Sequence, residues 1–351
     1  MDVQEFLTKM SSYPHVSGYE SELAGFIKDV FAKYTQSSID KFGNVIANKP
    51  SLTSTGQNTK IMFCAHMDEN GLMVADIADD GFVKFSPVGG MDKRTMLAQE
   101  VTIHGREKVY GVIGTKPPHL TDPKERSKSI EFHDMAIDTG FSKEKLSQII
   151  RPGDIITMNQ GISELQNKKL TGRSLDNIVG VAALYCAMKS LEHFNHNADL
   201  YFVASAQEEV GKGGARTATY TIKPDIGIAV DVGQGRIPGL AEYEAFELGK
   251  GPVLGIGPNF NRKLFDDLKK VATKNNAKYQ VEVIPFMSGT DATDIQISGD
   301  GVITGLMSIP LKYMHSTVET VAVSDIESCG KLMADYIIEC MADDRIGVVE
   351  S

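Results

Sequence analysis

Cysteine is scarce in this sequence, and the few cysteines are scattered. Cys64, Cys186, Cys329 and Cys340 are widely spaced and form no C-x-x-C pair. Four such residues in a chain of 351 do not make a disulfide framework, so we expect buried thiols in a reducing cytoplasm.

Long apolar runs and an excess of basic residues are also missing. No stretch approaches the roughly 18 apolar residues that a membrane span needs. Residues 1–5 lack the basic segment and apolar core of a secretory signal. The formal net charge is −10, and an acidic surface disfavours nucleic acid and anionic membranes as partners, because phosphate binding needs clustered lysine and arginine.

The composition is that of a folded globular protein, with 42% apolar and 23% charged residues. At about 150 residues per domain, the length predicts two domains. Residues 1–67 and 170–351 mix helices with strands, whereas residues 68–169 carry short strands between turns. This order predicts an α/β domain built from both ends of the chain and interrupted by an inserted β domain.

Apolar periodicity places the elements of each part. Helical spacing occurs at residues 23–31, 176–194, 264–272 and 325–340. Continuous apolar runs, typical of strands covered on both faces, occur at 60–64, 200–204 and 226–230. Short alternating runs, which predict a small barrel, occur at 72–77, 82–87, 101–104 and 108–113. Residues 116–128 contain three prolines and many charges and are expected to form a mobile loop.

Histidines and carboxylates gather at the ends of these predicted elements. In an open α/β sheet, reactive groups collect past the carboxyl ends of strands, so we expect these side chains to converge. They are His66, Asp68, Asp176, Glu208, Glu209, Asp231 and His315.

Two histidines and three carboxylates from distant segments are typical ligands of divalent metals such as Zn²⁺ or Co²⁺. Asp176, Glu209 and Asp231 carry three negative charges, which two divalent ions and one hydroxide would neutralise. Without metal, such carboxylates would raise one another's pKa. An ionised Glu208 would leave about one negative charge, which suits a substrate with a free α-ammonium group. This charge balance favours two metal ions over one.

Two short spacings suggest roles beyond metal binding. Asp68 is close enough in sequence to accept the second N–H of a metal-bound His66, which would fix the orientation of the ring. The adjacent Glu208 and Glu209 can divide two tasks, one binding metal and the other taking a proton from the metal-bound water.

Each residue taken alone has a more ordinary interpretation. His66 and His315 could be structural, Asp176 a helix cap, Asp231 part of a turn, Asp68 a surface residue, and Glu208 with Glu209 a solvated pair. Five coincidences at element ends favour the joint site. Residues 211–214 predict a tight turn into a helix rather than a phosphate loop, and residues 289–292 fit a pocket wall and a capped turn equally well.

At these residues the sequence resembles the dinuclear-metal tetrahedral aminopeptidases, which include glutamyl and deblocking aminopeptidases. Some members carry the name endoglucanase or cellulase, which this site does not support. The matching motifs run through nearly the whole chain in family order: AHMDENGLMV (65–74), KPPHL (116–120), GRSLDNIVG (172–180), AQEEVGKGGA (206–215), AVDVG (229–233), SGTDATDIQ (288–296) and IPLKYMHSTVET (309–320).

The resemblance implies a role for each candidate. One metal would be held by His66, Asp176 and Asp231, and the other by Asp176, Glu209 and His315. Glu208 would be the general base, and Asp68 would orient His66. It also implies an α/β/α catalytic domain with a mixed sheet and an inserted β-barrel dimerisation domain at 68–169. Family members cleave peptides with a free N-terminus, and their dimers commonly assemble into tetrahedral dodecamers.

Two departures from the family pattern bear on the site. Asp176 is followed by Asn177, where the family often has a second acidic residue, and residues 232–238 differ from the usual loop. We expect Asn177 to alter the surroundings of the metals without abolishing activity, and residues 232–238 to alter the local pocket and thereby the substrate preference. Two rival functions are a dinuclear deacylase or carboxypeptidase acting on N-acyl amino acids, and a catalytically silent binding protein.

Overall fold

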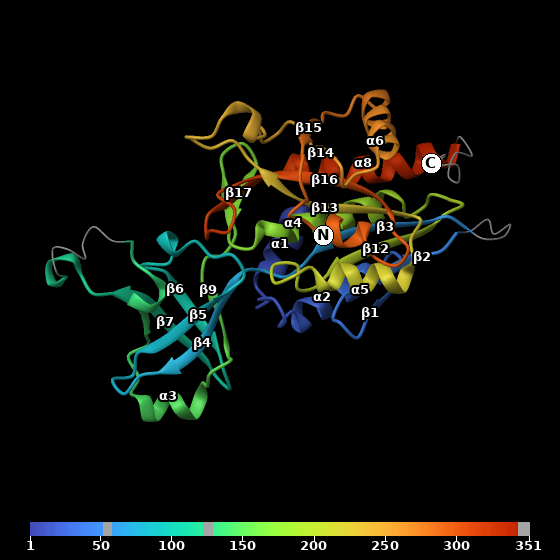
Figure 1. Cartoon of the computed structure of the whole chain (residues 1–351). Helices are drawn as coiled ribbons and strands as arrows, with labels where there is room; N and C mark the ends of the chain where they lie inside the picture. The colour runs from blue at the N-terminus through green and yellow to red at the C-terminus, as the bar shows by residue number, and fades with distance from the viewer. Residues whose placement is uncertain (52–57, 122–128, 343–351) are drawn as a thin grey trace.

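Two sheets organise the chain, which the computed structural model describes over residues 1–51, 58–121 and 129–342. A mixed sheet of 11 strands forms an α/β unit, and a closed antiparallel barrel of six strands lies beside it (Figure 1). The predicted fold class is confirmed: a mixed sheet between two layers of helices, with a barrel inserted in the chain.

The large sheet has its parallel strands at the centre. Along the sheet the order is β1 (Gln36–Ile39), β2 (Val45–Lys49), β12 (Asp199–Ser205), β3 (Lys60–His66), β13 (Ile226–Gln234), β16 (Ile303–Lys312), β17 (Glu319–Ala322), β11 (Lys169–Gly172) and β10 (Ser163–Leu165). Strand β14 (Val253–Ile256) pairs with β16, and β15 (Gln280–Val283) pairs with β14. Strands β12, β3, β13 and β16 are parallel to one another, so their carboxyl ends meet at one edge.

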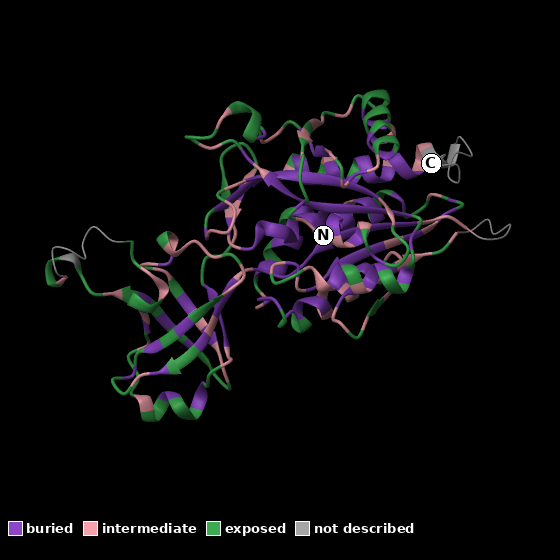
Figure 2. Ribbon diagram, viewed as in Figure 1, coloured by how far each residue is buried: buried purple, intermediate pink, exposed green. Residues whose placement is uncertain are grey.

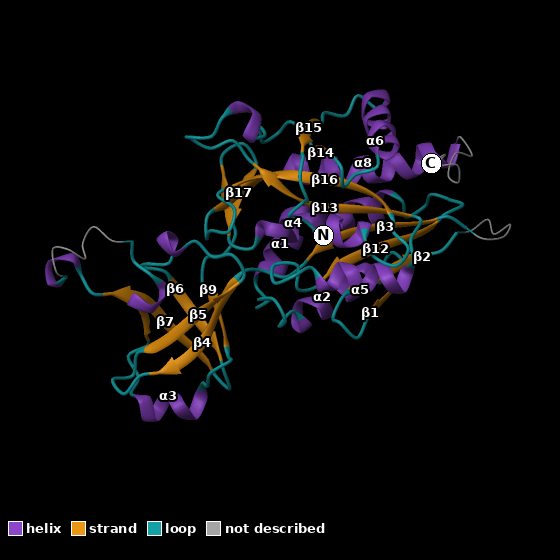
Figure 3. Ribbon diagram, viewed as in Figure 1, coloured by secondary structure: helices purple, strands orange, loops and turns teal. Residues whose placement is uncertain are grey.

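Helices cover both faces of this sheet (Figure 3). One face carries α1 (Val3–Ser11), α2 (Ser21–Phe31), α4 (Leu175–Ser190), α6 (Arg262–Lys274) and α8 (Val323–Ala342). The other carries α5 (Gly213–Ile222) and α7 (Ala292–Gln296). The central strands are therefore buried along nearly their whole length, as Figure 2 shows, which explains their unbroken apolar sequence.

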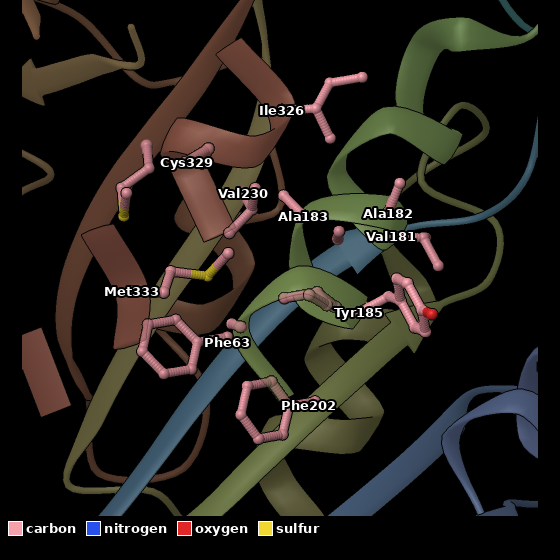
Figure 4. Packing of buried hydrophobic residues seen from close by; sticks show 14 of the residues in the cluster. Phe63, Val181, Ala182, Ala183, Tyr185, Phe202, Val230, Ile326, Cys329 and Met333 are labelled. Carbon is pink, nitrogen blue, oxygen red and sulfur yellow. The ribbon is translucent and has the colours of Figure 1, made fainter. Parts of the chain in front are cut away.

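Helix α4 crosses the centre of the core and brings its first turn to the site. Figure 4 shows Ala183 of α4 and Met333 of α8 near Val230 of β13, with the stacked rings of Phe63 and Phe202 below. All five residues are buried, and burying a large apolar side chain contributes roughly 1.5–3 kcal/mol. This packing holds the strand ends and the start of α4 in fixed relation.

The barrel has its own core. Its strands, in order around the barrel, are β4 (Gly71–Ile77), β5 (Val83–Val88), β8 (Met135–Asp138), β7 (Lys108–Thr115), β6 (Glu100–His104) and β9 (Ile155–Met158), and α3 (Lys143–Ile149) packs against it. Buried and exposed residues alternate along β7, as expected when one face lines the interior. Short 3₁₀ helices lie at Lys93–Thr95, Pro118–Leu120, Phe132–Asp134 and Glu242–Glu244.

Several sequence expectations differ in detail from the structure. Asp231 lies within β13 rather than after it, because β13 continues its parallel pairing with β16 as far as Gln234. Helix α4 ends at Ser190, four residues before the expected end. Strand β10 pairs with β11 in the large sheet, so the strand pairing changes from barrel to large sheet between Met158 and Ser163. The domain boundaries at 67 and 169 stay predictions.

The expectation of buried thiols is met in part by the described residues, and the expectation of a mobile loop stays a prediction. Cys64, Cys186 and Cys329 are free thiols, of which Cys64 and Cys329 are buried. The side chain of Cys340 lies outside the described part of the chain, as do residues 122–128 of the expected loop. Among the helices of the described ranges, none combines the length and apolar character that a membrane crossing requires.

Candidate metal centre

The seven candidate residues lie together where the parallel strands end. His66 is the last residue of β3, Asp231 lies in the last half of β13, and Asp176 lies in the first turn of α4. Glu208 and Glu209 occupy the turn that follows β12, and His315 lies in the turn after β16. The convergence expected from the sequence is therefore present.

Two sets of three side chains share one member. In the first trio, His66 Nε2 lies 3.2 Å from Asp176 Oδ1 and 3.7 Å from Asp231 Oδ1. In the second trio, His315 Nε2 lies 3.4 Å from Asp176 Oδ2 and 3.5 Å from Glu209 Oε1. Within each trio the potential ligand atoms lie within 4.8 Å of one another. Asp176 belongs to both trios and turns one carboxylate oxygen toward the histidine of each.

These spacings suit metal ligands better than ion pairs. A charge-assisted N–H···O bond is typically about 2.7–2.9 Å, shorter than all four distances. Ligands bound tetrahedrally at about 2.0–2.1 Å from zinc lie roughly 3.3 Å apart. In addition, Asp176 Oδ1 is buried and has no hydrogen-bond partner among the described residues. A buried oxygen without a donor is costly, and a cation between the three side chains would satisfy it.

Asp68 organises the turn that carries the two glutamates. Its buried carboxylate accepts hydrogen bonds from the backbone N–H of Glu208 at 2.9 Å, from the N–H of Glu209 at 3.2 Å, and from Ser17 Oγ at 2.6 Å. His66 Nδ1 lies 3.1 Å from the Asp68 carbonyl oxygen and 3.6 Å from its Oδ1. Residue 68 therefore contacts the His66 ring through its main chain as well as its carboxylate.

Glu319 is a site residue that the sequence analysis missed, although it lies within a quoted motif. Its buried carboxylate accepts a hydrogen bond from the N–H of His315 at 2.8 Å and one from the N–H of Asp176 at 3.0 Å. Burial raises the pKa of Glu319 well above its ordinary value, while the two N–H donors act in the opposite direction. One side chain thus fastens the backbone of a member of each trio. The sequence signal that could have pointed to it is an acidic residue four positions after His315, within the motif at 309–320.

Asn177 also uses both ends of its side chain. Its Nδ2 donates to the Val230 carbonyl at 2.8 Å, and its Oδ1 accepts from the N–H of Gly180 at 3.0 Å. An ionised aspartate could not donate to Val230. Gly180 lets α4 approach β3, because a Cβ there would lie 2.9 Å from Ala65 Cβ, next to His66.

The charges of the site shift the pKa values of its members in opposite directions. Burial raises the pKa of Glu208 to about 9, and nearby Asp231 and Asp291 add to the effect. The neighbouring Asp176 carboxylate raises the pKa of His315 to about 9. Burial opposes ionisation of Asp176, but its contacts with His315 and His66 outweigh burial and lower its pKa. The protein groups alone set these directions, and bound cations would change them.

The other motifs have structural explanations. Residues 211–214 form the expected turn into α5, with Lys212 in the left-handed region. Asp291 does not cap α7 through its side chain. Its Oδ2 accepts a hydrogen bond from Ser205 Oγ at 2.6 Å and lies 3.6 Å from Cys64 Sγ. A small cavity of about 30 Å³ beside Asp176 and His315 is lined by residues of both sheets and of their connections.

Comparison with known proteins identifies the class. A family model for the M42 glutamyl aminopeptidases matches residues 43–332. The chain therefore belongs to the M42 glutamyl aminopeptidase family and is a hydrolase of the aminopeptidase type, which removes N-terminal residues from peptides. The predicted family and enzyme class are confirmed.

Individual relatives cover nearly the whole chain. A lysyl aminopeptidase of Pyrococcus furiosus is 37% identical over 337 residues, which are 93% of this chain and 94% of the relative. An aminopeptidase of the archaeon Desulfurococcus kamchatkensis superposes with a TM-score of 0.90 at 35% identity, covering 99% of both chains. The TET1 peptidase of Pyrococcus horikoshii, which can assemble into a tetrahedron or a large octahedral shell, gives 0.84 at 33% identity, covering 96% of this chain and 99% of its own.

Proposed function

We propose that this chain hydrolyses the N-terminal residue from peptides with two divalent cations bound side by side. The first trio would hold one cation and the second trio the other, with Asp176 shared. Metal dependence is a property of the M42 peptidases; the number of ions and the role of each residue are our proposal.

The geometry of Asp176 is the observation that supports two ions. Its Oδ1 lies 3.2 Å from His66 Nε2, and its Oδ2 lies 3.4 Å from His315 Nε2. A single ion could use one of these oxygens and would leave the other among negative charges. Two ions bring four positive charges to a site that also contains Glu209 and Asp231.

The protein groups then divide the reaction. When bound, the cations polarise the scissile carbonyl and lower the pKa of a coordinated water to about 7. Glu208 would accept a proton from the attacking water and pass it to the leaving amino group. Asp68 would hold Glu208 in place through its N–H. Two divalent ions, one hydroxide and the three ligand carboxylates cancel in charge, so an ionised Glu208 leaves about one negative charge. This charge would attract the α-ammonium group of the substrate, which restricts cleavage to N-termini.

The ligand types favour Zn²⁺ or Co²⁺. Each trio offers one imidazole nitrogen and two carboxylates, a set that suits borderline divalent metals. The closed antiparallel barrel of the inserted segment also favours the aminopeptidase over the deacylase alternative, for which we would expect an α+β insertion.

Assembly and location complete the proposal. Because the Pyrococcus horikoshii TET1 peptidase assembles into a tetrahedron, we propose that this chain forms a homo-oligomer in which dimers build a tetrahedral dodecamer. A cytoplasmic location stays a prediction. The free thiols of Cys64, Cys186 and Cys329 support it.

A metal-supplemented substrate screen tests the proposal. The protein is stripped with a chelator, reloaded with Zn²⁺, Co²⁺ or Mn²⁺, and assayed on aminoacyl substrates beside their N-acylated counterparts, with metal content and native mass measured in parallel. We expect cleavage of the free-amine substrates only, and about two ions per chain. Cleavage confined to the N-acylated substrates would support a deacylase or carboxypeptidase instead. Inactivity with every metal would support a catalytically silent binding protein.

A further inference from the structure

We propose that Asn70 is a positioning residue that, together with the Gly89-Gly90 backbone, holds the two unshared members of the second trio and so sets the affinity of that metal site selectively. The inference rests on the proposed dinuclear function. These three residues lie in the connections on either side of the first two barrel strands.

Asn70 orients the Glu209 carboxylate. It lies between the end of β3 at His66 and the start of β4 at Gly71, and its Nδ2 donates a hydrogen bond to Glu209 Oε1 at 2.7 Å. The same oxygen lies 3.5 Å from His315 Nε2. A metal-bound carboxylate is ionised and can only accept, so the amide must present its N–H₂ group to it. The contact therefore fixes which way Oε1 faces.

The absence of a side chain at Gly89 makes room for the Asn70 amide. A Cβ at Gly89 would lie 1.8 Å from Asn70 Oδ1 and 3.5 Å from Glu209 Cβ, and Gly89 has φ +77°. Asn70 Oδ1 is buried without a hydrogen-bond partner in the described part of the chain. The amide thus occupies the space that a side chain at Gly89 would take, with its donor side toward Glu209.

Gly90 places the same backbone against His315. A Cβ at Gly90 would lie 3.3 Å from His315 Nδ1 and 3.5 Å from Cε1. At 33% exposed, the His315 side chain is the most exposed of the five candidate metal ligands. The Gly90 backbone therefore lies beside the ring, and a side chain at this position would press against it.

The first trio has a different kind of support. The contacts of His66 Nδ1 are with Asp68, and Asp231 Oδ1 accepts from the N–H of Val232 in its own strand. Asp68 shares the connection between β3 and β4 with Asn70, but its contact within the first trio is with His66, whereas Asn70, Gly89 and Gly90 lie against Glu209 and His315. Substitutions at Asn70, Gly89 or Gly90 should accordingly act on the second site rather than the first.

Metal titration of the full-length, metal-free protein tests the inference. Co²⁺ is added stepwise to the wild type and followed by calorimetry and by its visible absorption. His315→Ala identifies the step that belongs to the second trio. We expect Asn70→Ala to weaken that step about 10–100-fold and to alter its absorption, while the other step stays within about twofold. Gly90→Ala should weaken the same step to a smaller extent.

The matched control is Gly114→Ala, a barrel glycine at which a Cβ meets no atom within 4 Å; it should leave both steps unchanged. Two unchanged steps in Asn70→Ala, or equal weakening of both, would overturn the inference while the dinuclear function stands. If Asn70→Ala does not fold, Gly90→Ala takes its place: selective weakening of the second-trio step supports the inference, and two unchanged or equally weakened steps overturn it. A wild type that binds fewer than two ions would overturn the proposed function and this inference with it.

Discussion

Replacement of Glu319 by glutamine should weaken metal binding without removing a ligand. The carboxylate accepts one backbone N–H on each oxygen, from His315 and from Asp176. Glutamine has a single oxygen, so one hydrogen bond is lost and an N–H₂ group faces a backbone N–H. A hydrogen bond to a charged acceptor contributes about 1.5–3 kcal/mol, and about 1.4 kcal/mol corresponds to a tenfold change. We expect metal affinity to fall roughly 10–100-fold.

Asp325→Asn provides a control of the same design away from the site. The buried Asp325 also accepts one backbone N–H on each oxygen, from Gly249 at 2.7 Å and Gly251 at 2.9 Å. Both variants should lower the free energy of unfolding of the metal-free protein by a similar amount, measured by chemical denaturation. Only Glu319→Gln should lower metal affinity, measured by calorimetric titration. Equal metal affinity in the two variants would refute the reasoning that Glu319 positions the trios.

Three further predictions concern the proposed reaction and its metals. Glu208→Gln should reduce kcat by about 10²–10⁴-fold with metal content unchanged, and full activity in this variant would rule out the base assignment. Asp68→Asn should lose the hydrogen bond to the N–H of Glu208 or of Glu209 and lower activity about 10–100-fold, whereas wild-type kcat and metal content would show that the carboxylate is dispensable. Metal removal should lower the midpoint of thermal unfolding, because ions that bind only the folded state stabilise it; identical melting curves with and without chelator would contradict a site buried as deeply as His66 and Asp176.

Much of the architecture could be predicted because it depends on local patterns. The apolar runs at 60–64 and 200–204 and the helical spacing at 264–272 correspond to β3, β12 and α6. The alternation in residues 72–113 predicted barrel strands, because one face of each strand is buried. Asp231 was misplaced relative to its strand, since pairing with β16 extends β13 beyond the apolar run.

The chemistry of the site divides in the same way. Histidines and carboxylates at element ends, read beside the family motifs, were enough to name both trios and Glu208, because ligand type is a property of single residues. The contacts that orient them were not foreseeable. Glu319 reaches Asp176 across 143 positions of sequence, and Asn70 reaches Glu209 across 139. No local pattern encodes such partners; only the tertiary arrangement of the barrel connections, α4 and the large sheet brings their atoms within hydrogen-bond distance.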